Sequence, residues 1–159
     1  MNSYVEPTAR RSRLGHSRKQ RGSTAIEFAM IFPLFFVVLY GIITFSMIFV
    51  AQQSLTLAAE EGARAALTYQ KGDTPDLALS ARVDTVCPTA KSMLTPMVAT
   101  ADCHATSTTC NSGMACVNVI VSYSYADKPL VPSLPILGDV LPTTLTSSAT
   151  IQLNPVNLL

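Results

Sequence analysis

The sequence has no charged residue between Phe28 and Ala51, a run of 24 residues. As an α-helix this run would reach roughly 36 Å at about 1.5 Å per residue, and the hydrocarbon core of a bilayer is about 30 Å thick. The length suffices to cross a membrane with some tilt. We therefore expect a membrane-inserted chain, in which Glu27, directly before the run, needs an explanation.

Groups that could carry catalysis are also scarce. The two histidines, His16 and His104, lie far apart in the sequence, and no nucleophile, base and orienting group recur together. Acidic residues are scattered through turn-like or helical contexts, where solvated carboxylates are usual, and a glycine-rich phosphate-binding loop is absent from the sequence. These absences argue against an enzyme and predict no cofactor.

No two cysteines have the C-x-x-C spacing, and His104 beside Cys103 is not enough to build a tetrahedral zinc site, so we expect no metal. All four cysteines follow the apolar run, on the side where disulfides would persist after export. Two bridges are predicted, with free thiols as the alternative. Three pairings are possible, and proximity in sequence suggests Cys87 with Cys103 and Cys110 with Cys116.

Charge is divided unevenly along the chain. Residues 1–22 carry a net charge of +5, and the remainder carries −4. A cationic flank beside a membrane helix stays cytoplasmic, because translocating Lys and Arg is costly. We therefore expect a cytoplasmic leader at 1–22, a transmembrane helix at 23–51 and an extracytoplasmic head domain at 52–159. The division indicates topology rather than binding to nucleic acid.

Two helices are predicted. The first begins near Thr24 and continues past the apolar run to about Lys71, with a stripe of mostly small residues: Leu55, Ala59, Gly62, Ala66 and Tyr69. The second has Thr74 as its N-cap and Pro75 at its first helical position. Pro88 is expected to end or kink this second helix.

Two strands are predicted where apolar and polar residues alternate, at 115–125 and 144–153, with a proline-rich connector between them. Residues 99–116 are expected to form a disulfide-pinned loop. The fold class is therefore α+β, with a long N-terminal helix, a short second helix and a small antiparallel hairpin or sheet packed on the long helix.

The stretch RGSTAIEF, in which a basic segment is closed by Gly22 and followed by Glu27 and an apolar helix, resembles the class III signal of type IV prepilins and pseudopilins. Together with IEFAMIFPLFFVVLYGIITFS, AQQSLTLAAEEGARAAL, VNVIVSYSY and SSATIQL, it resembles the TadE-like minor pilins, or pseudopilins, of tight-adherence (Flp-type, type IVb) pilus systems. The resemblance implies that a prepilin peptidase cuts between Gly22 and Ser23. It also implies other minor pilins and an assembly platform as partners, a bacterial inner-membrane location and a role in surface adhesion.

Glu27 has two compatible interpretations. A carboxylate at the lipid boundary is costly unless neutralised, and the new α-amine of Ser23 on a neighbouring subunit could neutralise it during assembly. Alternatively, Thr24 and Glu27 have the spacing of a capping box. Pro33, six residues after Glu27, removes a backbone hydrogen bond and is expected to kink the helix, either as a tolerated membrane proline or for subunit packing.

Two other functions stay open. An unprocessed, signal-anchored envelope protein could use its head to bind a ligand or partner, and a membrane-tethered enzyme is a third possibility. The N-terminus separates the first two, because only a processed pilin would begin at Ser23.

Overall fold

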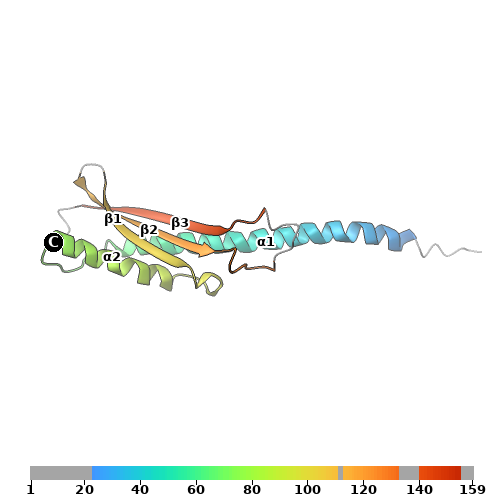
Figure 1. Cartoon of the computed structure of the whole chain (residues 1–159), viewed down its shortest axis with the longest axis horizontal. Coiled ribbons are helices and arrows are strands. Elements are labelled where there is room, and N and C mark those ends of the chain that lie inside the picture. The colour runs from blue at the N-terminus through green and yellow to red at the C-terminus, as the bar shows by residue number, and fades with distance from the viewer. Residues whose placement is uncertain (1–22, 111–112, 133–139, 155–159) are drawn as a thin grey trace, which may run out of the picture. The chain divides into compact units, whose positions relative to one another are not determined.

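The computed structural model describes residues 23–110, 113–132 and 140–154. In these ranges the chain forms α1 (Ser23–Ala65), α2 (Pro75–Ser92), the short η1 (Pro96–Val98), β1 (Asp102–Thr109), β2 (Ala115–Ser124) and β3 (Thr144–Leu153) (Figure 1). The expected α+β class, with a long first helix, a second helix and an antiparallel sheet, is confirmed. The predicted leader, including Gly22, lies outside the described residues.

The chain divides into two compact units, Met1–Leu39 and Tyr40–Leu159, and α1 belongs to both. In the first unit, every described side chain from Thr24 to Leu39 is exposed. The helix continues through Pro33, which therefore does not end it. Phe28, Phe32 and Phe36 follow each other along one face, with ring centroids 5.3 and 6.3 Å apart.

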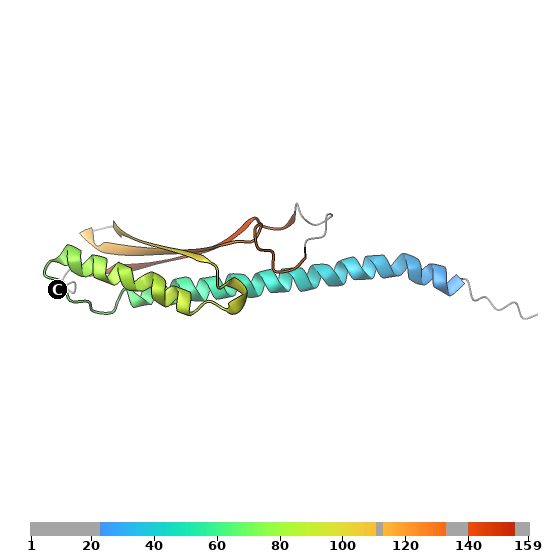
Figure 2. The same ribbon diagram turned by 60° about the horizontal axis from the view of Figure 1, so that its bottom comes forward.

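The second unit is built on a three-stranded antiparallel sheet of the described residues, in the order β1-β2-β3. In β2, the odd-numbered Val117, Val119 and Val121 are fully buried, and the intervening side chains are more exposed, as the alternating pattern predicts. Figure 2 shows α2 and the part of α1 in this unit on one side of the sheet. The core therefore lies between one sheet face and two helices.

Strand β1 replaces the loop that the sequence suggested. Asp102–Thr109 pairs with β2 along its whole length, from Asp102 opposite Ser122 to Thr109 opposite Ala115. Its side chains are small or polar, and only Cys103 and Ala105 are half-buried, so no strong apolar alternation marks it. An edge strand can be held by its backbone ladder to a well-buried neighbour, which explains why side-chain pattern missed it.

The small-residue stripe of α1 packs inside this unit, as predicted. Leu55, Ala59 and Ala66 have no exposed surface, and Gly62 lies so close to α2 that a Cβ there would be 2.9 Å from Ala90 Cβ. Small side chains permit such a close approach between helices. The prediction for Tyr69 is wrong, because the helix ends at Ala65 and Tyr69 is 62% exposed.

Helix α2 starts as the sequence predicts and ends later. The Thr74 side chain caps it by accepting a hydrogen bond from the Leu77 backbone N at 3.3 Å, and Pro75 is the first helical residue. Pro88 lies inside the helix, which continues to Ser92.

Two disulfides join the four cysteines in the described chain. Cys87 of α2 is bonded to Cys103 of β1, with a Cα–Cα distance of 5.6 Å, and Cys110 is bonded to Cys116 with 5.8 Å. This is the pairing that proximity in sequence suggested. The first bridge ties α2 to the edge strand, and the second closes the β1–β2 connection.

Candidate assembly and membrane segment

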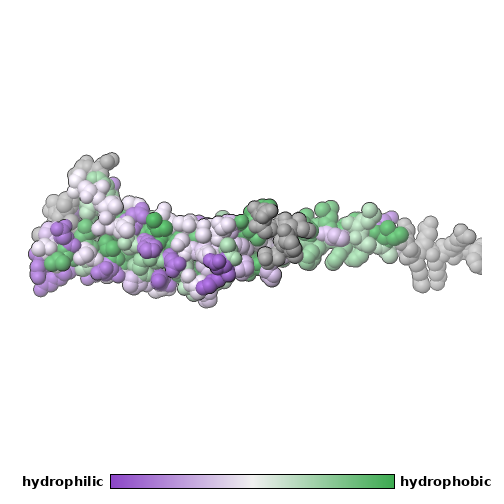
Figure 3. Space-filling model, in the orientation of Figure 1, coloured by the Kyte–Doolittle hydropathy of each residue, from purple (hydrophilic) through white to green (hydrophobic). Residues whose placement is uncertain are grey.

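Helix α1 presents an extensive apolar surface. Among the described residues it is the one helix long and apolar enough to cross a membrane. Figure 3 shows hydrophobic side chains covering its N-terminal part. Exposed fractions there include 76% for Met30 and 67% for Leu34. Such a surface requires cover by lipid or by other apolar helices.

Glu27 is the fifth residue of α1 and has an exposed side chain. The residue before Ser23 lies outside the described residues, so the capping-box interpretation of Thr24 and Glu27 stays a prediction. Glu27 lies one turn after Ser23, near the positive end of the helix dipole.

Tyr40 is the point at which the second unit begins to cover α1. Its hydroxyl donates a hydrogen bond to the backbone carbonyl of Pro132, in the connector that follows β2. One turn later, Thr44 is 1% exposed, and its hydroxyl donates to the Tyr40 carbonyl at 2.8 Å. Ile48 and Ala51 continue this covered stripe. One face of the range 40–51, which the sequence assigned to the membrane helix, is thus covered by the head.

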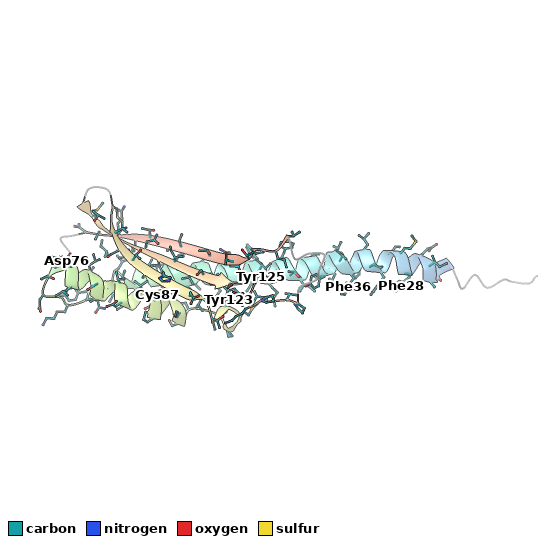
Figure 4. All side chains as sticks on the ribbon, in the orientation of Figure 1. Phe28, Phe36, Asp76, Cys87, Tyr123 and Tyr125 are labelled. Carbon is teal, nitrogen blue, oxygen red and sulfur yellow. A yellow bond between two sulfur atoms is a disulfide. The ribbon has the colours of Figure 1, made fainter. Side chains whose placement is uncertain are left out.

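Three tyrosines lie near one another in this unit, and Figure 4 labels two of them, Tyr123 and Tyr125. The Tyr123 hydroxyl donates to the Lys128 carbonyl at 2.8 Å. The Tyr125 hydroxyl is buried and has no hydrogen-bond partner within the described ranges. Burial, with smaller contributions from the nearby Tyr40 and Tyr123 phenols, raises the pKa of Tyr125 above its ordinary value of 10.0.

Sequence reasoning did not find the contact between Tyr40 and Pro132. The available signal was the position of Tyr40, whose phenol carries a hydroxyl that needs a partner inside an otherwise apolar run. The partner itself lies 92 residues away in sequence, so only the tertiary structure identifies it.

No group of three metal-ligating side chains comes together in the described parts of the chain. His104 is exposed on β1, and its neighbour Cys103 is held in a disulfide. A bonded cysteine cannot supply a thiolate to zinc.

The comparison with protein families identifies the N-terminal part of the chain. Residues 22–64 match the family of TadE-like proteins. This segment is TadE-like. The match spans nearly all of α1 and supports involvement with tight-adherence pilus systems, as the resemblance of the sequence suggested. No curated protein and no solved structure matched the chain.

Proposed function

We propose that this TadE-like chain is a minor pilin or pseudopilin that takes part in assembling a tight-adherence type IVb pilus. The observation that supports the proposal most directly is the family match over residues 22–64. The matched residues form most of α1, which exposes apolar side chains throughout the first unit of the chain. Its role is structural, with no catalytic activity of its own. Its partners are a prepilin peptidase, other minor pilins and the assembly platform, and the assembled pilus serves surface attachment.

In this proposal α1 crosses the bacterial inner membrane, with the basic leader in the cytoplasm and the head outside. The net charge of +5 in residues 1–22 favours that orientation. The two disulfides fit an oxidising compartment for the head.

A prepilin peptidase removes the leader by cutting between Gly22 and Ser23. The cut lies directly before Ser23, which is helical, so the mature chain begins with its assembly helix. Intact mass of the membrane-extracted protein tests this cut, because the processed chain starts at Ser23. Gly22→Ala should retain the leader, and Gly15→Ala, a glycine substitution within the leader, should leave processing unchanged.

A mature chain that keeps residues 1–22 would contradict the proposal and favour the unprocessed, signal-anchored envelope protein. A short form that persists in Gly22→Ala would show that the cleavage site is assigned wrongly.

Glu27 acts as the assembly contact, neutralised by the α-amine of Ser23 on a neighbouring subunit. A charged side chain costs about 2.5–3.5 kcal/mol at mid-bilayer and less near the boundary, so Glu27→Ala should weaken association by about 1–2 kcal/mol. Co-purification with the other pilins, compared with membrane insertion, measures this effect. Glu60→Ala, which removes an exposed acid from the same helix in the head, is the matched control. If Glu27→Ala and Glu60→Ala associate equally well with the other pilins, Glu27 is not an assembly contact.

A further inference from the structure

The head covers α1 before the helix can leave an ordinary bilayer. A membrane-spanning helix needs about 20 residues, with a lower limit of about 17. Counted from Phe28, 20 residues reach Met47, and counted from Thr24, even the lower limit reaches Tyr40. The head is already packed on α1 at Tyr40 and Thr44. Tilt would only increase the number of residues required.

The depth of the head relative to lipid rests on the proposed insertion of α1 in the membrane. Given that insertion, the part of the head beside Tyr40 has to lie at the depth of the lipid boundary. The remaining question is whether its chemistry suits that environment.

The end of the head beside Tyr40 is formed by the two described arms of the connector between β2 and β3. Figures 1 and 2 place both arms at the same end of the sheet, and the arm that follows β2 reaches α1, where Tyr40 donates to the Pro132 carbonyl. One arm holds the half-buried Val131, and the other holds Val140, which is 63% exposed. Leu130 and Leu141, one in each arm, are half-buried and pack partly against the core of the head. These aliphatic side chains fit the acyl side of a membrane interface.

Polar groups at this end fit the headgroup side. Tyrosine is enriched at membrane–water interfaces because its ring is apolar and its hydroxyl is polar. Tyr40 lies at the junction, and the nearest described charges along the connector are the exposed Asp127 and Lys128, in the turn directly after β2. A lysine can extend its ammonium toward phosphate while its stem stays in an apolar layer.

The surface of α1 at the same level is apolar as well. Ile42 is 60% exposed, Phe45 53% and Phe49 63%, on the sides of the helix that the head leaves uncovered. A second subunit could cover such a surface in a filament. The span length, however, brings this level of the molecule to the lipid boundary in every inserted copy, whether assembled or alone. Lipid is therefore the occupant that the geometry favours.

We propose that the end of the head formed by Tyr40, Leu130, Val131, Val140 and Leu141 docks into the boundary between lipid headgroups and acyl chains. The head thus rests on the membrane and does not stand clear of it on a helical stalk. Leaving the membrane during assembly requires this apolar end to be transferred from lipid to another cover.

Depth-resolved fluorescence quenching tests the proposal on the full-length chain. The sequence has no tryptophan, so each substitution introduces a single probe. Val140→Trp and Val131→Trp report from the two connector arms. Thr108→Trp, on an exposed position near the far end of β1, is the matched head control, and Phe36→Trp reports insertion of α1. Each variant is reconstituted at low density in phosphatidylcholine–phosphatidylglycerol vesicles, with or without phosphatidylcholine brominated at shallow acyl carbons.

We expect bromolipid to reduce the emission of Val140→Trp and Val131→Trp, and to leave Thr108→Trp unchanged. Quenching of Phe36→Trp alone, with both connector probes as bright as Thr108→Trp, would overturn the lipid docking while leaving membrane insertion intact. A connector probe whose emission is blue-shifted but not quenched by bromolipid would be covered by something other than lipid. If the blue shift disappears when the protein is diluted in the vesicles, the cover is a second copy of the chain, and the lipid docking is overturned. An unquenched Phe36→Trp, in vesicles whose acyl bromines span the bilayer depth, would refute the membrane insertion itself.

Discussion

A close approach between α1 and α2, at Gly62, provides a test of the packing of the head. A methyl carbon at this position would lie 2.9 Å from Ala90 Cβ and 3.2 Å from the Val86 carbonyl oxygen. Favourable carbon–carbon contacts lie at about 3.5–4.0 Å, so α1 and α2 would have to move apart. Neither neighbouring atom can rotate away, because one is a Cβ and the other belongs to the backbone.

Two effects of Gly62→Ala oppose each other. Alanine is more favourable than glycine in a helix by about 1 kcal/mol. Overpacking a close contact costs about 1–3 kcal/mol, because it forces the surrounding backbone to shift. We therefore expect a net loss of up to about 2 kcal/mol in the free energy of unfolding, measured by urea unfolding of the full-length protein in detergent.

Gly41 provides the matched control, since it lies in the same helix and nothing lies within 4 Å of a Cβ added there. Gly41→Ala should be neutral or stabilise the chain by up to about 1 kcal/mol. The double variant Gly62→Ala/Ala90→Gly removes the 2.9 Å contact, so its loss should be smaller than the sum of the two single losses. Additive losses, or a Gly62→Ala variant as stable as Gly41→Ala, would refute the close approach.

The remaining predictions concern the cap of α2 and the tyrosines. Thr74→Ala should lower the free energy of unfolding by about 1 kcal/mol, because it removes the acceptor for Leu77 N, whereas Thr74→Ser should retain most of it; equal losses would argue against the cap. Tyr123→Phe loses a hydrogen bond to the Lys128 carbonyl and should cost about 1 kcal/mol, whereas Tyr125→Phe should be neutral or stabilising, since its buried hydroxyl has no partner in the described chain. Because the pKa of Tyr125 is raised in the folded state, the unfolded chain loses this proton first, and the free energy of unfolding should fall as the pH rises above 10.0. Unfolding measured as a function of pH should show a smaller fall for Tyr125→Phe. A fall of the same size in that variant would contradict the burial of the phenol.

Local patterns predicted the elements with strong side-chain signals. The alternation of Val117, Val119 and Val121 predicts a half-buried strand because every second side chain of a strand faces the same side. Thr74 and Pro75 mark the start of α2 because a side-chain acceptor and a fixed φ suit the first helical turn. These features act over a few residues, so the sequence contains them in full.

Features with weak local signals were misjudged. Strand β1 has little apolar surface, and its backbone hydrogen bonds come from β2. The sequence placed the end of α1 near Lys71, later than its end at Ala65 in the structure. The backbone N–H groups of Ala66, Leu67 and Thr68 bond to carbonyls three positions earlier, as in a turn. Helical composition continues past this point, so the local pattern does not mark the end of the helix.

The sequence by itself determined the apolar helix, the uneven charge, the position of Glu27 after Gly22 and the class of fold, because hydrophobicity, charge and periodicity are properties of neighbouring residues. Only the tertiary structure decided how far the head reaches along α1. The bond from Tyr40 to Pro132 joins segments distant in sequence, and Thr44, one turn later, is buried. No periodicity of the apolar run distinguishes a helix face in lipid from one against protein. Both environments are apolar, so they select the same side chains.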